Sequence, residues 1–163
     1  MVYVIMGVSG CGKTTIGKMV AAEKGVPFFD GDNFHPEENV KKMSQGIPLN
    51  DEDRKPWLEI LAHQITEWNK SGGAVLACSA LKESYRNHLK SQSKYDQVQF
   101  IYLKGSKDLI SERLHKRSGH YMPADLLDSQ FNDLEEPKDA ITISVDGEPK
   151  TIAHEILKLT DSK

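Results

Sequence analysis

The sequence predicts an α/β fold with three layers, in which helices cover both faces of a five-stranded parallel sheet. Strand-like apolar runs alternate with helix-like segments along 163 residues, and most of the intervening segments are long enough to hold a crossover helix. The expected strands are Val2–Met6, Pro27–Phe29, Ala74–Cys78, Val98–Leu103 and Ala140–Val145. No repeat, low-complexity tract or linker divides the chain, so residues 1–163 are expected to form a single domain.

The composition narrows the classes of partner. A formal net charge of −3 and a pI of about 6.1 provide no basic field for holding nucleic acid. No apolar run is long enough to cross a membrane, and a strand that begins at residue 2 leaves no room for a signal peptide. Two cysteines, Cys11 and Cys78, do not make a disulfide framework. A cytoplasmic setting is therefore expected.

The first strand runs into a segment, residues 7–14, that fits the phosphate-binding pattern G-x-x-x-x-G-K-[ST] and opens an amphipathic helix. Its glycines let backbone N–H groups surround phosphate oxygens, and the helix directs its positive end to the same place. Lys13 is expected to contact the β and γ phosphates of a nucleoside triphosphate, and the Thr14 hydroxyl to ligate Mg²⁺. The expected ATP-binding residues of the loop are Gly7, Val8, Ser9, Gly10, Cys11, Gly12, Lys13, Thr14 and Thr15. A glycine-rich turn that binds nothing is the alternative, and the flanking strand and helix argue against it.

The second strand leads into Asp30-Gly31-Asp32, with His35 shortly after. Ligands of parallel sheets lie beyond the carboxyl ends of the strands, so both carboxylates can serve one site. Asp30 is suited to hold the metal through water, and Asp32 to accept a proton from an attacking hydroxyl. His35 is a candidate for substrate contact. The alternative for all three residues is a turn that introduces the next helix.

Arg54 stands near the start of a helix whose apolar stripe is best interpreted as core. Asn50 or Asp51 can cap this helix, and Pro56 is expected only within its first turn. A guanidinium binds carboxylates or phosphates through two parallel hydrogen bonds, which makes Arg54 a candidate for substrate binding. A local ion pair with Asp51 or Asp53 is the alternative.

Three polar residues, Ser79, Lys82 and Arg86, follow the third strand at the expected active edge of the sheet. Lys82 and Arg86 share one helical face, which suits an anionic substrate or an ordinary solvated helix. The third strand does not end in an acidic residue, so the metal is expected at Asp30.

After the fourth strand, Arg113 and Arg117 share another helical face. One arginine can stack on the nucleotide base while the other reaches the transferring phosphoryl group, although a charged helix end explains the pair as well. Gln130, in the next helical segment, is a possible polar contact for the substrate.

Taken together, these motifs resemble the gluconokinase family of small phosphate-loop kinases, which is related to shikimate and nucleoside monophosphate kinases. Besides the phosphate loop, the resemblance depends on five segments, namely Asp30-Gly31-Asp32 with His35-Pro36, Lys42-Met43 through Pro48-Leu49-Asn50-Asp51 to Asp53-Arg54 with Pro56-Trp57, Ala77–Lys82 with Tyr85-Arg86, Arg113-Leu114 with Arg117 and His120, and Ser129-Gln130-Phe131. It covers nearly the whole chain.

The resemblance implies transfer of the ATP γ-phosphoryl group to the 6-hydroxyl of D-gluconate, a mobile lid around residues 117–125, and a homodimer. It implies that Asp32 and Arg54 face the sugar acid with His35, Lys82 and Arg86 nearby. Arg113 and Arg117 would then attend the nucleotide and the lid, and Lys13, Asp32 and Arg117 would be the catalytic residues. A shikimate or nucleotide kinase and an ATP-sensing module that transfers nothing are the rival hypotheses.

Overall fold

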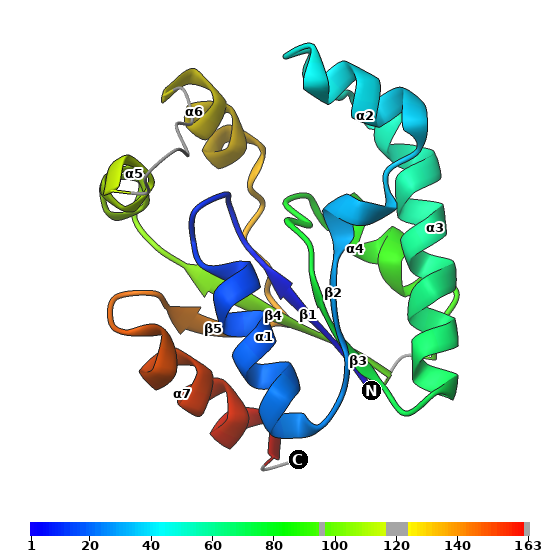
Figure 1. The fold of residues 1–163 in the computed structure, drawn as a ribbon, viewed down its shortest axis with the longest axis vertical. Coiled ribbons are helices and arrows are strands. Elements are labelled where there is room, and N and C mark those ends of the chain that lie inside the picture. The colour runs from blue at the N-terminus through cyan, green and yellow to red at the C-terminus, as the bar shows by residue number, and fades with distance from the viewer. Residues whose placement is uncertain (95–96, 117–123, 162–163) are drawn as a thin grey trace.

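A computed structural model describes residues 1–94, 97–116 and 124–161, and these have the predicted α/β order (Figure 1). The strands are β1 (Val2–Met6), β2 (Phe28–Asp30), β3 (Ala74–Ala77), β4 (Val98–Lys104) and β5 (Ile141–Ser144). The helices are α1 (Lys13–Lys24), α2 (Glu37–Ser44), α3 (Asp51–Lys70), α4 (Glu83–Lys90), α5 (Lys107–Lys116), α6 (Ala124–Asp133) and α7 (Pro149–Asp161), and a short 3₁₀ helix, η1 (Gly31–Phe34), follows β2. All five predicted strands are confirmed, with ends that differ by no more than one residue.

The five strands form one parallel sheet in the order β2-β3-β1-β4-β5. The central strand is β1, where Val4 pairs with Leu76 of β3 and Phe100 of β4. All strands run the same way, so the segments that follow β1, β2 and β3 emerge at one edge of the sheet. This edge is where a parallel sheet binds its ligands.

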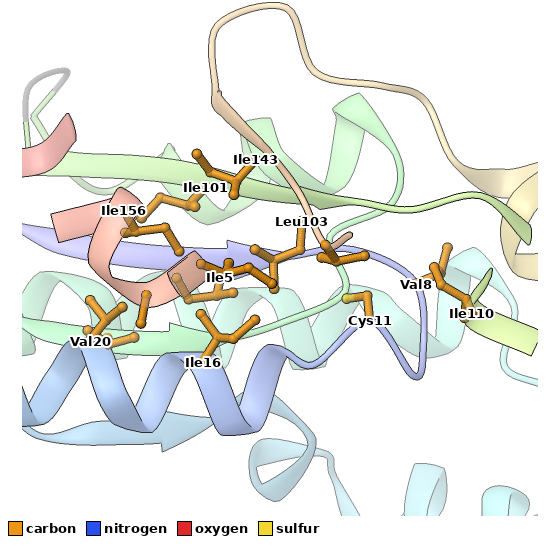
Figure 2. Packing of buried hydrophobic residues seen from close by; sticks show 14 of the residues in the cluster. Ile5, Val8, Cys11, Ile16, Val20, Ile101, Leu103, Ile110, Ile143 and Ile156 are labelled. Atoms are coloured by element: carbon orange, nitrogen blue, oxygen red, sulfur yellow. The ribbon is translucent and has the colours of Figure 1, made fainter. Parts of the chain in front are cut away.

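Helices cover both faces of the sheet, as Figure 1 shows. Side chains alternate along β1, so Ile5 joins the core under α1 and α7, whereas Val4 and Met6 pack on the α3 and α4 side. Figure 2 shows the first of these cores, with Ile16 and Ile156 close to Ile5. The predicted three-layer architecture is therefore confirmed.

Helix α3 begins with a reciprocal cap in which the Asn50 side chain accepts from the Asp53 N–H and the Asp53 side chain accepts from the Asn50 N–H. The expectation that Pro56 lies in the first turn is wrong, because Pro56 is the sixth residue of this helix. A proline there leaves the Glu52 carbonyl without its helical donor. The cap and the buried apolar stripe of the helix offset this cost.

Two expectations fall outside the described residues. Arg117 and most of the lid expected at residues 117–125 belong to the segment 117–123, which the structure does not describe.

Among the helices that the structure does describe, none is long and apolar enough to cross a membrane.

Candidate active site

The loop between β1 and α1 depends on glycine. Gly7 has φ 148°, and a Cβ there would lie 2.8 Å from Cys11 Sγ and 2.9 Å from the Leu103 carbonyl oxygen. Gly12, the N-cap of α1, has φ 99° and provides no side-chain cap, and the first turn of α1 carries no acidic residue. The N–H groups at this helix end are therefore open to an anion. Burial raises the pKa of the Cys11 thiol, which keeps this residue of the loop neutral.

Lys13 lies back over its own loop, where its ammonium donates to the carbonyls of Gly7 at 2.9 Å and Val8 at 3.1 Å. The loop is also tied to the end of β3, since the Gly7 N–H donates to the Ser79 carbonyl at 3.2 Å. Ser79 thus borders the phosphate loop, as its place after the third strand predicts. A positive charge lies within the loop, where it can meet phosphate oxygens.

Gln130 of α6 binds the phosphate loop through both ends of its side-chain amide. Its Oε1 accepts from the Ser9 N–H at 2.7 Å, and its Nε2 donates to Ser9 Oγ at 2.9 Å. These hydrogen bonds hold α6 against the loop, and the expectation that Gln130 contacts the substrate stays a prediction. The two residues are 121 positions apart, which is why local sequence did not indicate this contact.

Asp30 plays the turn role that was the alternative for it, because its Oδ1 accepts from the Asp32 N–H at 2.9 Å and starts η1. It also lines a pocket of about 320 Å³ together with Thr14 of α1. Carboxylate and hydroxyl oxygens are the donors that Mg²⁺ prefers, so these two residues fit a magnesium ion. Among the described residues there is no cluster of three or more His, Cys, Asp or Glu that could hold a metal.

Asp32 faces solvent, with 81% of its side chain accessible. Desolvation by nearby protein atoms and the Asp30 carboxylate raise the pKa of Asp32, whereas His35 and Lys13 lower it. Solvent screens part of this effect, because most of the carboxylate is open to water. Lys13 of the phosphate loop is thus near enough to Asp32 to act on it electrostatically.

His35 stands behind Asp32, with its Nε2 3.9 Å from Asp32 Oδ1. Its ring stacks on Trp57 at a centroid distance of 4.3 Å, and its side chain is 5% accessible. Trp57 is itself held by its Nε1–H, which donates to the Gly31 carbonyl at 2.8 Å. Burial lowers the pKa of His35, while Asp32 raises it and Arg54 lowers it further. The imidazole is therefore neutral near pH 7.

Arg54 takes part in a cluster around the Asp51 carboxylate. Asp51 Oδ1 lies 2.5 Å from Tyr85 Oη, 3.4 Å from Lys82 Nζ and 3.8 Å from an Arg54 guanidinium nitrogen, which also donates to Tyr85 Oη at 3.1 Å. The Tyr85 hydroxyl, followed by Lys82 and Arg54, holds the pKa of Asp51 below its usual value. The local pair that was the alternative for Arg54 is present. The same geometry shows that Arg54, Lys82 and Tyr85 converge on a carboxylate.

Arg86 was expected to bind substrate, but in the structure its side chain bonds to the protein backbone. It is buried, and its guanidinium donates to the carbonyls of Ala80 at 2.7 Å, Leu81 at 3.1 Å and Glu135 at 2.7 Å. Ala80 has a positive φ of 46°, which is strained for a residue with a side chain. Arg86 therefore stabilises the loop that carries Lys82 to the site. Its guanidinium donates its hydrogen bonds to backbone carbonyls of this loop and of Glu135.

Arg113 ties α5 to the segment after β5, where it donates to the carbonyls of Val145 at 2.5 Å and Gly147 at 3.4 Å. This segment also emerges at the carboxyl edge of the sheet. Its Val145 belongs to the same buried cluster as Val8 and Cys11 of the phosphate loop. The expected companion of Arg113, Arg117, lies outside the described residues.

Known proteins are similar to this chain in sequence. The shikimate kinase family model matches residues 9–160. A probable gluconokinase of Dictyostelium discoideum is 50% identical over 142 residues, which cover 84% of this chain and 71% of the relative. The gluconokinase of Gluconobacter oxydans (strain 621H) is 43% identical over 159 residues, 95% of this chain and 88% of that protein. The chain belongs to the gluconokinase family.

Solved structures agree with membership of the gluconokinase family. The crystal structure of a gluconokinase from Sinorhizobium meliloti 1021 matches with a TM-score of 0.86 and 41% identity, covering 96% of this chain and 89% of that chain. The shikimate kinase of Aquifex aeolicus, at 19% identity and a TM-score of 0.64 over 99% of this chain and 96% of that chain, shares the fold alone. The protein is thus a carbohydrate kinase of an ATP-using family built on a shikimate-kinase-like fold.

Two residues of the kinase site were not singled out from sequence. Tyr85 was given no role of its own, and only the packing of α4 against α3 brings its hydroxyl to Asp51 and Arg54. Asn39 has no motif of its own, yet it is buried behind His35. The spacing of His35 and Asn39, four residues apart across a helix start, was a signal that could have indicated their contact.

Proposed function

We propose that this kinase transfers the γ-phosphoryl group of ATP to the 6-hydroxyl of D-gluconate, giving 6-phospho-D-gluconate and ADP. The observation that carries the proposal is the order of charged groups along one edge of the sheet. Lys13 acts electrostatically on Asp32, Asp32 acts on His35, and Arg54 acts on His35 as well. A phosphate site and a carboxylate site therefore flank one exposed acid.

The phosphate loop, residues 7–15, would bind the ATP phosphates through its N–H groups and the end of α1. Lys13 would exchange its two carbonyl contacts for the β and γ phosphates. Arg113 would shape the nucleotide side of the site, and Arg117 is retained as the proposed catalytic arginine on the strength of the family resemblance.

Thr14 and Asp30 would hold Mg²⁺, which neutralises phosphate charge when it is bound. Both residues line the same pocket and offer oxygen ligands. Asp30 would keep its hydrogen bond from the Asp32 N–H, so that it also orients Asp32.

Gluconate carries its carboxylate and its 6-hydroxyl at opposite ends of a six-carbon chain, so it needs two separated polar sites. Arg54 and Lys82, assisted by Tyr85, would bind the carboxylate, since these groups already converge on that of Asp51. Asp32 would accept the proton of the 6-hydroxyl as the phosphoryl group transfers. His35 and Ser79 would line the path between the two ends.

An ADP-release assay with gluconate, shikimate, AMP or no acceptor tests the proposal. We expect ADP release that depends on gluconate, with 6-phosphogluconate as the product. Release that depends on shikimate or AMP instead would indicate a kinase of another specificity. ATP binding without release in the presence of any acceptor would indicate a nucleotide-sensing module.

The family resemblance extends the proposal to a homodimer, which light scattering on the purified protein tests directly. A cytoplasmic setting, expected from the sparse cysteines, belongs to the same proposal. Cys11 and Cys78 are both free.

A further inference from the structure

A buried amide, Asn39 of α2, contacts His35 from behind. Asn39 is 3% accessible, although it is polar. Its Nδ2 lies 3.2 Å from His35 Nδ1 and 2.8 Å from the Asp53 carbonyl oxygen of α3. The proposed reaction leaves this amide without a role.

The two contacts of Asn39 decide where the proton of His35 lies. A backbone carbonyl can only accept, so the Asn39 atom that faces Asp53 must be the NH₂ group. The same nitrogen faces His35 Nδ1, which must therefore be the unprotonated nitrogen of the ring. A neutral imidazole carries one proton, and here it must be on Nε2.

The rest of the surroundings aim this proton at the reacting site. Stacking on Trp57, with an interplanar angle of 15°, fixes the plane of the ring. Nε2 points to the side of Asp32 and lies 3.9 Å from its Oδ1, slightly beyond hydrogen-bond distance. The charged groups that act on the ring are Asp32 of η1 and Arg54 of α3, and burial opposes a second proton.

We propose that Asn39 is a positioning residue that keeps His35 in its neutral Nε2–H form, so that the imidazole directs its N–H toward the Asp32 carboxylate. His35 then cannot accept the proton of the substrate, because its only unprotonated nitrogen is occupied by the Asn39 amide. Asp32 remains the proposed proton acceptor, and the His35 N–H faces it. The catalytic part of this inference rests on the proposed function of Asp32, whereas the position of the proton does not.

Long-range ¹H–¹⁵N correlation spectra of protein labelled with [¹⁵N]histidine test the proton position without any substrate. In the wild type we expect His35, identified by its loss in His35→Gln, to show an unprotonated Nδ1 and a protonated Nε2. In Asn39→Asp the new carboxylate only accepts, so a proton should move to Nδ1. A protonated Nδ1 in the wild type would overturn the inference, even if Asn39→Asp does not fold.

Asn69→Asp is the matched control, because the Asn69 amide of α3 also donates to a backbone carbonyl, that of Gln97 at 3.2 Å. It should leave the His35 signals unchanged. If both variants alter the His35 signals alike, Asn39 has no specific effect on the ring.

Kinetics test the catalytic part with gluconate and ATP. Asn39→Asp should lower kcat about 10-fold or more while the KM for ATP stays constant, as expected for a misplaced catalytic contact. His35→Gln places an amide N–H near the Nε2 position and should retain more activity than His35→Asn, which places it near Nδ1. Equal activities, or an unchanged kcat in Asn39→Asp, would refute the positioning role. If no variant or wild type phosphorylates gluconate while the spectra agree, the proposed function fails and the tautomer assignment stands.

Discussion

Replacing Arg54 by Lys tests whether the proposed carboxylate site is distinct from the phosphate site. The Arg54 side chain is 26% accessible, and one of its guanidinium nitrogens lies 3.1 Å from Tyr85 Oη and 3.8 Å from Asp51 Oδ1. Lysine keeps the charge but presents a single nitrogen on a flexible stem, so it cannot bind a carboxylate through two parallel hydrogen bonds. The variant therefore loses about one charge-assisted hydrogen bond to gluconate.

A hydrogen bond to a charged group at a partly exposed position contributes about 1.5 to 2 kcal/mol, which corresponds to a roughly 10- to 30-fold weaker affinity. We expect this loss in the KM for gluconate. The KM for ATP should stay within about twofold, because the contacts of Arg54 go to Asp51 and Tyr85 and none goes to the phosphate loop among the described residues.

Initial rates of ADP release, with each substrate varied in turn, measure both constants. Lys55→Arg is the matched control, since Lys55 is the next residue of α3, is exposed, and should tolerate the change without effect. A KM for ATP that rises as much as the KM for gluconate would refute the assignment of Arg54 to the sugar acid. So would an unchanged KM for gluconate.

Four further predictions concern other parts of the site. Asp32→Asn should lower kcat by about 10²-fold or more in the same assay, the scale of a general base, and a parental rate would remove Asp32 from that role. The pKa of His35 is lowered from 6.5, so below that pH the unfolded chain binds a proton that the folded protein does not. The free energy of unfolding should therefore have its full value above pH 6.5 and fall as the pH drops below it. Urea unfolding at a series of pH values measures this dependence, and in His35→Gln the free energy of unfolding should fall less steeply with pH. Trp57→Phe removes the buried donor to the Gly31 carbonyl and should cost about 2 kcal/mol in urea unfolding, whereas a loss below about 0.5 kcal/mol would contradict a structural role for that bond. Burial raises the pKa of Cys78 to about 12, so a thiol reagent at neutral pH should modify it only after unfolding, and rapid labelling of the native protein would disprove its protection.

Features that depend on local pattern were predictable from the sequence. The phosphate loop follows from glycine spacing between an apolar run and a helical stripe, and the structure gives Gly7 and Gly12 the positive φ that the pattern requires. The central strands β1 and β3 follow from their apolar runs, because a strand buried on both faces excludes polar side chains. These features involve neighbours in the chain, so the chain itself carries the information.

The partners of individual side chains could not be predicted in this way. Arg86 and Lys82 share a helical face in the sequence, yet the structure buries one against three carbonyls and leaves the other near Asp51. The difference arises because the chain at Glu135 packs against Arg86. These two residues are 49 positions apart, so the spacing of residues within one helix could not predict their contact. Pro56 shows the same limit, since a strong cap and a buried stripe outweigh its unfavourable position in α3.

The sequence by itself determined the fold, the phosphate loop and the acid at the end of β2, because hydrophobic periodicity and glycine conformation act over a few residues. Only the tertiary structure decided that Gln130 bonds to the phosphate loop, that Tyr85 meets Arg54 at the Asp51 carboxylate, and that Asn39 lies against Nδ1 of His35. A hydrogen bond needs its donor and acceptor within about 3 Å in a suitable direction. For segments far apart in the chain, that distance is set by the order of the strands and the packing of the helices upon them.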